Sequence, residues 1–263
     1  MSARILHLSD LHVGAREELS AASGLALLVE RLGPELIVAS GDLTHQGTRA
    51  QHETAAALLK GVGVPILAVP GNHDISHAFP GRFTRSFAEF ERCWNTTTPV
   101  YASDTLHVVG LNSARPWHHQ SGGLRPEALA LATAELGRAA TGALRVVALH
   151  HQLIGAPWRS RKRPLAHRSE VLSALAEAGA DLIVSGHIHQ AAAASRYEFQ
   201  VPVGAGRDVT VTVAPGLGQP RPHRRGEACG VMAYSSDERE LQVETYLWDG
   251  ADWNVVARRL FRR

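Results

Sequence analysis

The sequence predicts an α/β fold with a largely parallel core, and three observations support this prediction. Short runs rich in Val, Ile and Leu recur along the chain, as in strands that are buried on both faces. Longer stretches with apolar residues at helical spacing separate these runs, which favours βαβ crossovers. The 263 residues, of which 44% are hydrophobic, are enough to bury a full core. We therefore expect a single domain over residues 1–263.

The first half of the chain alternates between predicted strands and predicted helices. The first helix is expected to stop at Gly33-Pro34, because Gly ends helices and Pro cannot continue them. The expected strands cover 4–8, 36–40 and 64–69, and the expected helices cover 17–32, 46–60 and 79–94.

The second half continues this alternation and then changes to strands alone. Strands are expected at 106–111, 144–149 and 181–185, and a helix is expected at 125–139. Because no linker-like segment precedes residue 196, we expect 196–263 to be a strand-rich, antiparallel continuation of the second sheet rather than another domain. Its short apolar runs, separated by turn signals, are 197–203, 209–213, 230–234, 241–248 and 253–260.

Polar residues directly follow five of the predicted strands. The carboxyl ends of parallel strands border the crevice in which open α/β sheets bind ligands, so we expect these side chains to converge. Any one of them is equally typical of a helix N-cap, a polar turn or a solvent-facing histidine. Together they offer enough nitrogen and oxygen atoms for two metal ions. The residues are Asp10, His12, Asp42, Asn72, His73, Asp74, His150, His151, His187 and His189.

Five motifs occur in a fixed order: Asp10-x-His12, Gly41-Asp42, Gly71-Asn72-His73-Asp74, His150 and Gly186-His187-x-His189. In this order they resemble the signature of the calcineurin-like metallophosphoesterases. The resemblance implies a four-layer sandwich of two mixed β-sheets flanked by helices, with a dinuclear metal site at the strand carboxyl ends. It implies that Asp42 bridges two divalent ions, with Asp10, His12 and His189 completing one site and Asn72, His150 and His187 the other. Mixed carboxylate, amide and imidazole ligands suit Mn, Fe and Zn alike.

His73 and Asp74 remain after the implied ligands are counted. We assign His73 to stabilise the phosphoryl group or to protonate the leaving oxygen. Asp74 is expected to orient the His73 imidazole and to hold it in its charged form. Similar families commonly have Pro after the paired histidines, whereas Gln152 follows His150-His151 here, so the loop beyond is expected to run differently. We do not expect His151 to be a metal ligand.

The resemblance implies hydrolysis of a phosphodiester by a hydroxide that bridges the two metals. The stretches 108–113 and 121–124 are also similar to the bacterial cyclic-nucleotide phosphodiesterases, so a cyclic nucleotide is a candidate substrate. Phosphomonoesterase and nuclease activities are alternatives on the same fold, and a non-catalytic binding scaffold is an alternative of another class. A scaffold has no reason to retain seven ligand residues together with His73.

Two basic runs, 159–163 and 221–225, lie outside the motifs. Each is typical of a solvated loop, and the first could also steer phosphate toward the metal site. His45, His118 and His119 could line the rim of the site, although solvated loop histidines are the simpler interpretation.

Composition limits the compartment and the partners. The 27 basic and 25 acidic residues leave a net charge of +2, which does not indicate a nucleic-acid partner, and a small phosphorylated substrate is favoured. Cys93 and Cys229 are far apart and form no C-x-x-C motif, which suits a reducing compartment. The apolar part of the first ten residues is shorter than the core of a signal peptide, and no apolar run of 18 residues occurs, so we expect a cytoplasmic protein without a membrane partner. Strand edges within 196–263 could pair in a homodimer.

Overall fold

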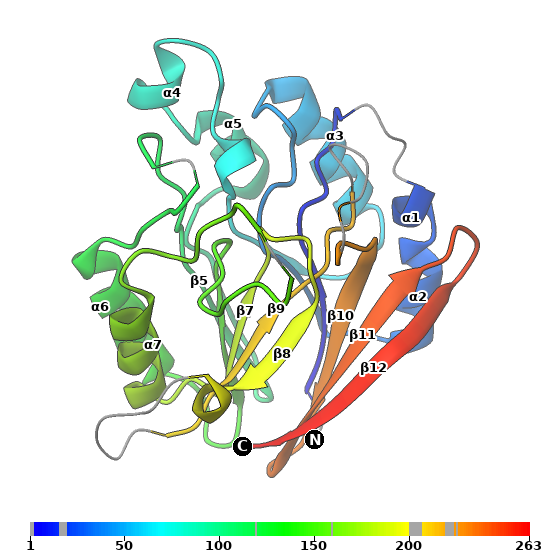
Figure 1. The fold of residues 1–263 in the computed structure, drawn as a ribbon, viewed down its shortest axis with the longest axis vertical. Coiled ribbons are helices and arrows are strands. Elements are labelled where there is room, and N and C mark those ends of the chain that lie inside the picture. Colours follow the sequence, from blue (N-terminus) through cyan, green and yellow to red (C-terminus); the bar gives the residue numbers. More distant parts are fainter. Residues whose placement is uncertain are drawn as a thin grey trace.

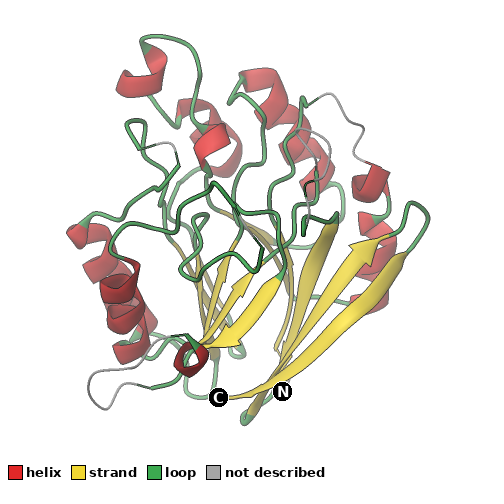
Figure 2. Ribbon diagram, viewed as in Figure 1, coloured by secondary structure: helices red, strands yellow, loops and turns green. Residues whose placement is uncertain are grey.

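Two six-stranded sheets form the centre of this computed structural model, which describes residues 3–15, 20–118, 120–158, 160–199, 207–218, 224 and 226–263. The sheets stack face to face, and helices cover their outer faces (Figures 1 and 2). The predicted α/β class and the four-layer sandwich of two mixed sheets flanked by helices are therefore confirmed.

The first sheet is built on three parallel strands from the N-terminal part of the chain. β1 (Ala3–Leu8) pairs with β2 (Leu36–Ala39), and β2 pairs with β3 (Ile66–Ala68). Because these strands run in the same direction, their carboxyl ends meet at one edge of the sheet, the upper edge in Figure 1.

The last three strands of the chain extend the first sheet. β10 (Gly230–Ser236) pairs antiparallel with β1, and β11 (Glu240–Trp248) and β12 (Trp253–Arg262) follow it outward. The expectation that residues 196–263 continue the second sheet is therefore wrong for these strands. The edge of β1 opposite β2 offers backbone hydrogen-bonding groups, and β10 satisfies them.

The second sheet has a parallel centre with one antiparallel strand at each edge. Its edge strands β4 and β8 are not among the strands that the sequence predicts. In spatial order the strands are β4 (Val100–Ala102), β5 (Leu106–Gly110), β6 (Leu144–Ala148), β7 (Leu182–Ser185), β9 (Thr210–Val213) and β8 (Ala192–Ser195).

Each sheet carries its own set of helices. The first sheet packs against α1 (Ser20–Ser23), α2 (Leu25–Leu32), α3 (Arg49–Lys60) and α5 (Ala88–Trp94). The second sheet packs against α6 (Pro126–Leu136) and α7 (Arg168–Glu177).

Alternation along the strands divides the core into three layers. In β1, Leu6 and Leu8 face the helices of the first sheet, whereas Ile5 packs between the two sheets. In β7, Ile183 faces α6 and α7, whereas Val184 packs between the sheets. The central strands of both sheets are therefore buried on both faces, which explains their continuous apolar runs.

Several segments differ from the predicted elements. The helix expected over 79–94 is interrupted between α4 (Gly81–Thr84) and α5, where the Ser86 hydroxyl donates a hydrogen bond to the Arg82 carbonyl at 2.6 Å. The sequence does not lead us to predict α7, although its buried residues follow helical spacing. The strand expected at 197–203 begins instead as a 3₁₀ turn, η2 (Arg196–Glu198), and 200–206 lie outside the described residues. In the part of the chain that the structure describes, no helix is both long and apolar enough to span a lipid bilayer.

Candidate metal centre

The loops that follow β1, β2, β3, β6 and β7 meet at the upper end of the two sheets (Figure 1). Both sheets contribute, because β1 to β3 belong to the first and β6 and β7 to the second. The seven residues expected as metal ligands all lie there and are almost completely buried. They are Asp10, His12, Asp42, Asn72, His150, His187 and His189.

One group consists of Asp10, His12 and His189, whose ligand atoms all lie within 4.8 Å of one another. The His189 Nε2 atom is 3.1 Å from Asp10 Oδ1 and 3.3 Å from His12 Nε2. Two imidazole nitrogens and a carboxylate oxygen therefore point at a common position, an arrangement that suits a divalent cation.

A second group consists of Asp42, His150 and His187, with the same limit of 4.8 Å between their ligand atoms. The His150 Nε2 atom is 3.3 Å from Asp42 Oδ1, 3.1 Å from His187 Nδ1 and 3.2 Å from Asn72 Oδ1. Asn72 thus joins this group through its amide oxygen, as the sequence motif suggests.

Asp42 connects the two groups. Its Oδ1 atom faces His150, and its Oδ2 atom is 3.8 Å from His12 Nε2 in the other group. A carboxylate with one oxygen turned toward each group can bridge two cations, which a neutral imidazole cannot do as well.

The hydrogen-bonding pattern of the two carboxylates fits metal binding. Asp10 Oδ2 accepts the backbone N–H of His187 at 2.9 Å, and Asp42 Oδ1 accepts that of His73 at 2.8 Å. Among the described residues, no donor forms a hydrogen bond with Asp10 Oδ1 or Asp42 Oδ2, although both atoms are buried. Buried oxygens of this kind are costly unless a cation satisfies them.

In two of the histidines, a hydrogen bond from one ring nitrogen to a backbone carbonyl determines that the second ring nitrogen is the ligand atom. His150 Nδ1 lies 2.9 Å from the Ser40 carbonyl, so it carries a proton and leaves Nε2 to act as a ligand. His187 Nε2 lies 3.1 Å from the Gln120 carbonyl, so Nδ1 is the ligand atom in that case.

Burial and neighbouring charges set the protonation of the centre. Burial lowers the pKa of His12 to about 4, and burial together with Lys162 holds the pKa of His187 well below its usual range. Burial opposes the charged form of His150 as well, but the Asp42 carboxylate outweighs this effect and raises its pKa to about 9. At neutral pH, His12 and His187 are therefore neutral, whereas His150 is protonated while no cation is bound.

Five of the seven expected ligand residues adopt left-handed backbone conformations. The φ angles are 55° at Asp10, 49° at His12, 51° at Asp42, 76° at His187 and 57° at His189. Such conformations cost on the order of 1–3 kcal/mol each in non-glycine residues and concentrate at functional sites. Backbone hydrogen bonds hold them, including Asp10 N to Gly41 O and His12 N to Asp42 O, both at 2.9 Å.

Glycines give the carboxylates room. At Gly186 an added Cβ would overlap Ser9 Oγ and would lie 2.6 Å from Asp10 Oδ2. At Gly71 it would overlap Asp42 Oδ1. Gly71 and Gly186, which belong to two of the three Gly-containing motifs, are therefore required by close approach to the carboxylates.

His73 and Asp74 do not pair as predicted. The Asp74 carboxylate accepts the backbone N–H groups of Leu43, Thr44 and Gly71 at 2.8–3.2 Å, and the Thr44 hydroxyl at 2.9 Å. His73 Nδ1 instead lies 2.8 Å from the carbonyl oxygen of His45. The expectation that Asp74 orients His73 is thus corrected, because backbone donors already use the Asp74 carboxylate.

His45 contributes more to the centre than a solvated loop histidine would. Its half-buried ring stacks on the His73 ring, with centroids 5.6 Å apart and an interplanar angle of 16°. The only indication of this contact in the sequence is that His45 lies three residues after Asp42. Single histidines in loops are too common for this spacing to predict a role at the centre.

In the first basic run, residues 159–163, Lys162 contacts a residue of the centre. The Lys162 ammonium donates a hydrogen bond to the His187 carbonyl, while Arg159 lies outside the described residues. In the second basic run, only Arg224 is described, and it is exposed.

His151 is buried beside His187, with ring centroids 4.6 Å apart, and its Nδ1 is 2.9 Å from Ser113 Oγ.

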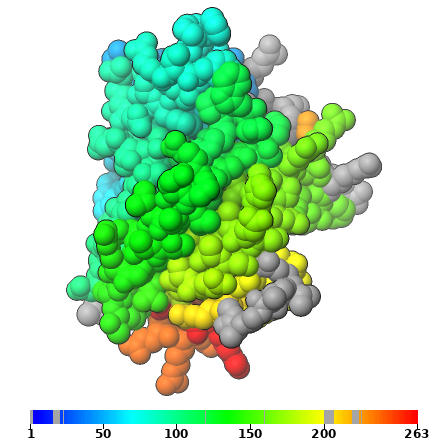
Figure 3. All heavy atoms as spheres, turned by 90° about the vertical axis from the view of Figure 1, so that its left-hand side faces the viewer, coloured from blue at the N-terminus to red at the C-terminus, as the bar shows by residue number. Residues whose placement is uncertain are grey.

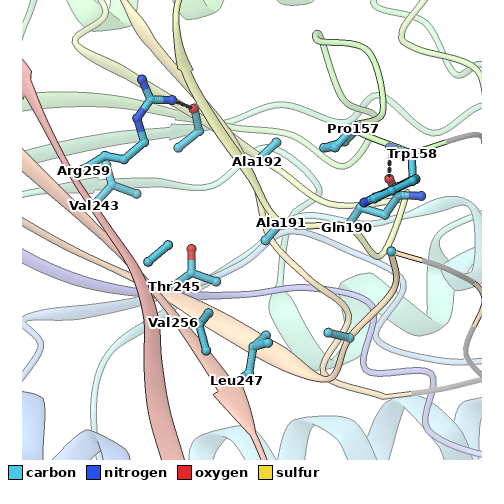
Figure 4. A pocket seen from close by; sticks show the side chains of 14 residues that line it. Pro157, Trp158, Gln190, Ala191, Ala192, Val243, Thr245, Leu247, Val256 and Arg259 are labelled. Atoms are coloured by element: carbon cyan, nitrogen blue, oxygen red, sulfur yellow. Dashed lines mark hydrogen bonds between the residues drawn. The ribbon is translucent and has the colours of Figure 1, made fainter.

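A cavity of about 280 Å³ lies beside the centre, between β8 and the strands β11 and β12 (Figure 4). Gln190, the residue after His189, lines one end and accepts the Trp158 backbone N–H at 2.8 Å. Apolar side chains such as Val243 and Leu247 line much of the rest. None of the expected ligand residues lines this cavity, so it is distinct from the metal centre.

Comparison with known proteins agrees with this geometry. A family model described as calcineurin-like phosphoesterase matches residues 3–191. A probable cyclic nucleotide phosphodiesterase from Synechococcus sp. is 30% identical over 206 residues, which cover 73% of this chain and 75% of that protein. A probable glycerophosphodiester phosphodiesterase from Arcobacter nitrofigilis is 25% identical over 124 residues, which cover 42% of this chain and 43% of that protein.

Two solved structures with low sequence identity share the fold. A purple acid phosphatase from yellow lupin superposes with a TM-score of 0.74 at 13% identity, over 100% of this chain and 54% of that chain. A dimetal phosphatase from Danio rerio superposes with a TM-score of 0.65 at 12% identity, over 97% of this chain and 98% of that chain.

Proposed function

Because this chain belongs to the calcineurin-like phosphoesterase family, we propose that it is a phosphodiesterase that uses two divalent metal ions. The observation that carries the proposal is the pair of buried carboxylate–imidazole groups joined by Asp42. Hydrolysis of a phosphate ester requires positive charge around the phosphoryl oxygens and an activated water. The donor atoms of the centre suit Mn, Fe or Zn.

We propose that the ligands are divided between the two ions as the family signature implies. We assign Asp10, His12 and His189 to one ion and Asn72, His150 and His187 to the other, with Asp42 shared between them. When bound, the two ions would activate a water for in-line attack and neutralise the phosphoryl oxygens.

The remaining residues act on the substrate or on the loops. His73 would stabilise the phosphoryl group or protonate the leaving oxygen, and the His45 carbonyl would orient its ring. We assign Asp74 a positioning role, because its carboxylate ties the loop after β2 to the turn that carries Asn72 and His73. Lys162 would add positive charge at the edge of the centre.

The substrate class rests on the relatives. The proteins from Synechococcus and Arcobacter are named as probable phosphodiesterases, one for cyclic nucleotides and one for glycerophosphodiesters. We therefore favour a small phosphodiester, with cyclic nucleotides as the leading candidates.

Metal removal tests the function directly. We expect a chelator to abolish hydrolysis of bis(p-nitrophenyl) phosphate and added Mn²⁺ to restore it, because no side chain of the centre replaces the charge of two cations. The reconstituted protein is then assayed on 3′,5′-cyclic AMP, p-nitrophenyl phosphate and single-stranded DNA. Activity that is indifferent to chelator and Mn²⁺ contradicts the proposal, and activity on the monoester alone identifies a phosphatase.

Metal binding should also release a proton. In the metal-free protein the pKa of His150 is about 9, so its Nε2 carries a proton at pH 7 that a cation must displace. We expect at least one proton released per chain on loading with Mn²⁺ at pH 7, one from His150 and a further one if a metal-bound water ionises, and an affinity that rises with pH. Calorimetric titration in buffers of different ionisation enthalpy measures this number. A value near zero would contradict the ligand role of His150.

A further inference from the structure

An exposed pair of stacked aromatic rings lies on the surface near the metal centre. The rings of Phe83 and Trp117 have centroids 4.0 Å apart and an interplanar angle of 20°. Trp117 is nevertheless 75% exposed and Phe83 is 38% exposed. One face of the indole thus packs on Phe83 while much of the side chain stays in contact with water, as in platforms that stack planar ligands.

Two separate segments build this pair and are tied together. Phe83 belongs to α4, and Trp117 belongs to the loop after β5. The Arg82 guanidinium donates a hydrogen bond to the Pro116 carbonyl at 3.2 Å, and it lies 6.0 Å from the centre of the Phe83 ring. The cyan atoms around α4 and green atoms of later loops adjoin at the top of the face in Figure 3. The platform is therefore held in place before any ligand binds, which lowers the entropy cost of binding.

Both segments also reach the metal centre. The segment before α4 contains His73 and His77, whose rings lie 6.4 Å apart. The segment with Trp117 contains Gln120, whose carbonyl accepts a hydrogen bond from the His187 imidazole at 3.1 Å. Three residues of chain span at most about 11 Å, so Trp117 cannot lie far from the position where His187 would bind metal.

We propose that the indole of Trp117, on its face turned away from Phe83, stacks on the nucleobase of a nucleotide substrate whose phosphodiester lies at the metal centre. This proposal rests on the phosphodiesterase function and names its substrate class. A nucleobase fits because it is planar, matches an indole in size and is attached to a phosphate group, and the loop that carries Trp117 also contacts His187 of the centre through Gln120. A substrate without an aromatic group, such as a glycerophosphodiester, would not use the platform.

A pair of ligands that differ only in the base tests the proposal. Adenosine 5′-monophosphate and ribose 5-phosphate share the sugar and the phosphate, and the first is also the product expected from 3′,5′-cyclic AMP. Binding of each to the Mn²⁺-loaded protein is measured by calorimetry. In Trp117→Ala we expect the dissociation constant for adenosine 5′-monophosphate to rise about fivefold to a hundredfold, the range found when a stacking residue is removed, while that for ribose 5-phosphate stays unchanged.

Two variants serve as controls. Trp117→Phe keeps an aromatic face and should retain most of the affinity for adenosine 5′-monophosphate. Tyr197→Ala removes another half-exposed aromatic ring, from η2, and should leave both affinities as in the native chain.

Two results would overturn the proposal. The first is an unchanged affinity of Trp117→Ala for adenosine 5′-monophosphate; an altered sedimentation coefficient in that case would identify the platform as a protein interface. The second is an equal loss for both ligands, which identifies a structural role of the indole. A separate assay tests the proposed phosphodiesterase function itself: if the native chain does not hydrolyse bis(p-nitrophenyl) phosphate, that function is wrong, whatever the binding measurements show.

Discussion

Replacing Asp42 with Asn is expected to lower kcat/KM for phosphodiester hydrolysis by about a thousandfold or more, which corresponds to at least about 4 kcal/mol of transition-state stabilisation. Asp42 has one carboxylate oxygen turned toward each ligand group, at 3.3 Å from His150 Nε2 and 3.8 Å from His12 Nε2. An amide keeps the shape of the side chain but loses the negative charge that a shared position between two cations requires. We expect the variant to hold less than one equivalent of Mn²⁺ per chain by elemental analysis.

A control for this variant must remove another buried carboxylate without touching the centre. Asp181 is suited to this purpose, since it is buried and its carboxylate accepts hydrogen bonds from the Arg145 backbone and from Arg207 and Arg263. Asp181→Asn should lower thermal stability while leaving the metal content unchanged. If Asp42→Asn kept two equivalents of metal and the native rate, the bridging role would be wrong.

The position of the candidate centre could be predicted because it depends on strand ends rather than on side-chain detail. Runs such as 36–39 and 182–184 are apolar throughout, since each strand lies between helices and the opposite sheet. Parallel pairing then brings the carboxyl ends of β1, β2 and β3, and of β6 and β7, to the same end of the molecule. A residue that directly follows such a strand has little freedom to lie elsewhere.

The pairing of side chains within the centre could not be predicted in the same way. Asp74 follows His73 directly, and adjacency suggested a hydrogen bond between them. Residues in the 3₁₀ turn η1 (Asn72–Asp74) point in different directions, however, so Asp74 meets the backbone of Thr44 while His73 meets the carbonyl of His45. Both contacts join residues about thirty positions apart, and no local pattern encodes them.

Sequence preferences also fail where the backbone is strained. Positive φ at Asp10, His12 and His189 could not be predicted from their residue types, since Asp and His adopt that region more often than most residues but still only in a minority of cases. Hydrogen bonds of the surrounding backbone stabilise this conformation. The side chains of these residues are thereby directed toward the centre. Disagreement between local preference and structure is itself typical of functional sites. The placement of β10 to β12 differs from the expectation for another reason, because the sheet that a strand joins is set by long-range pairing and not by local pattern.

Replacing His73 with Ala is expected to lower kcat about a hundredfold to ten-thousandfold while the protein keeps its full metal content, which is the range for loss of a general acid. His73 Nδ1 is engaged by the His45 carbonyl, so proton transfer to the leaving oxygen would use Nε2. The His73 ring also meets the His12 ring edge to face, with centroids 4.9 Å apart, so it borders the centre. The loss should be largest for diesters with poor leaving groups, since p-nitrophenolate departs without protonation whereas an alkoxide does not.

A leaving-group series separates the two roles open to His73. If its imidazole protonates the leaving oxygen, the rate deficit of His73→Ala should grow as the pKa of the leaving alcohol rises. If it stabilises the phosphoryl group, the deficit should be the same across the series. His77→Ala is the matched control, because it removes a neighbouring imidazole whose ring centroid is 6.4 Å from that of His73, and this change should leave the slope of the series unchanged. Loss of metal from His73→Ala would refute both roles, since it would make His73 a residue that holds the centre together.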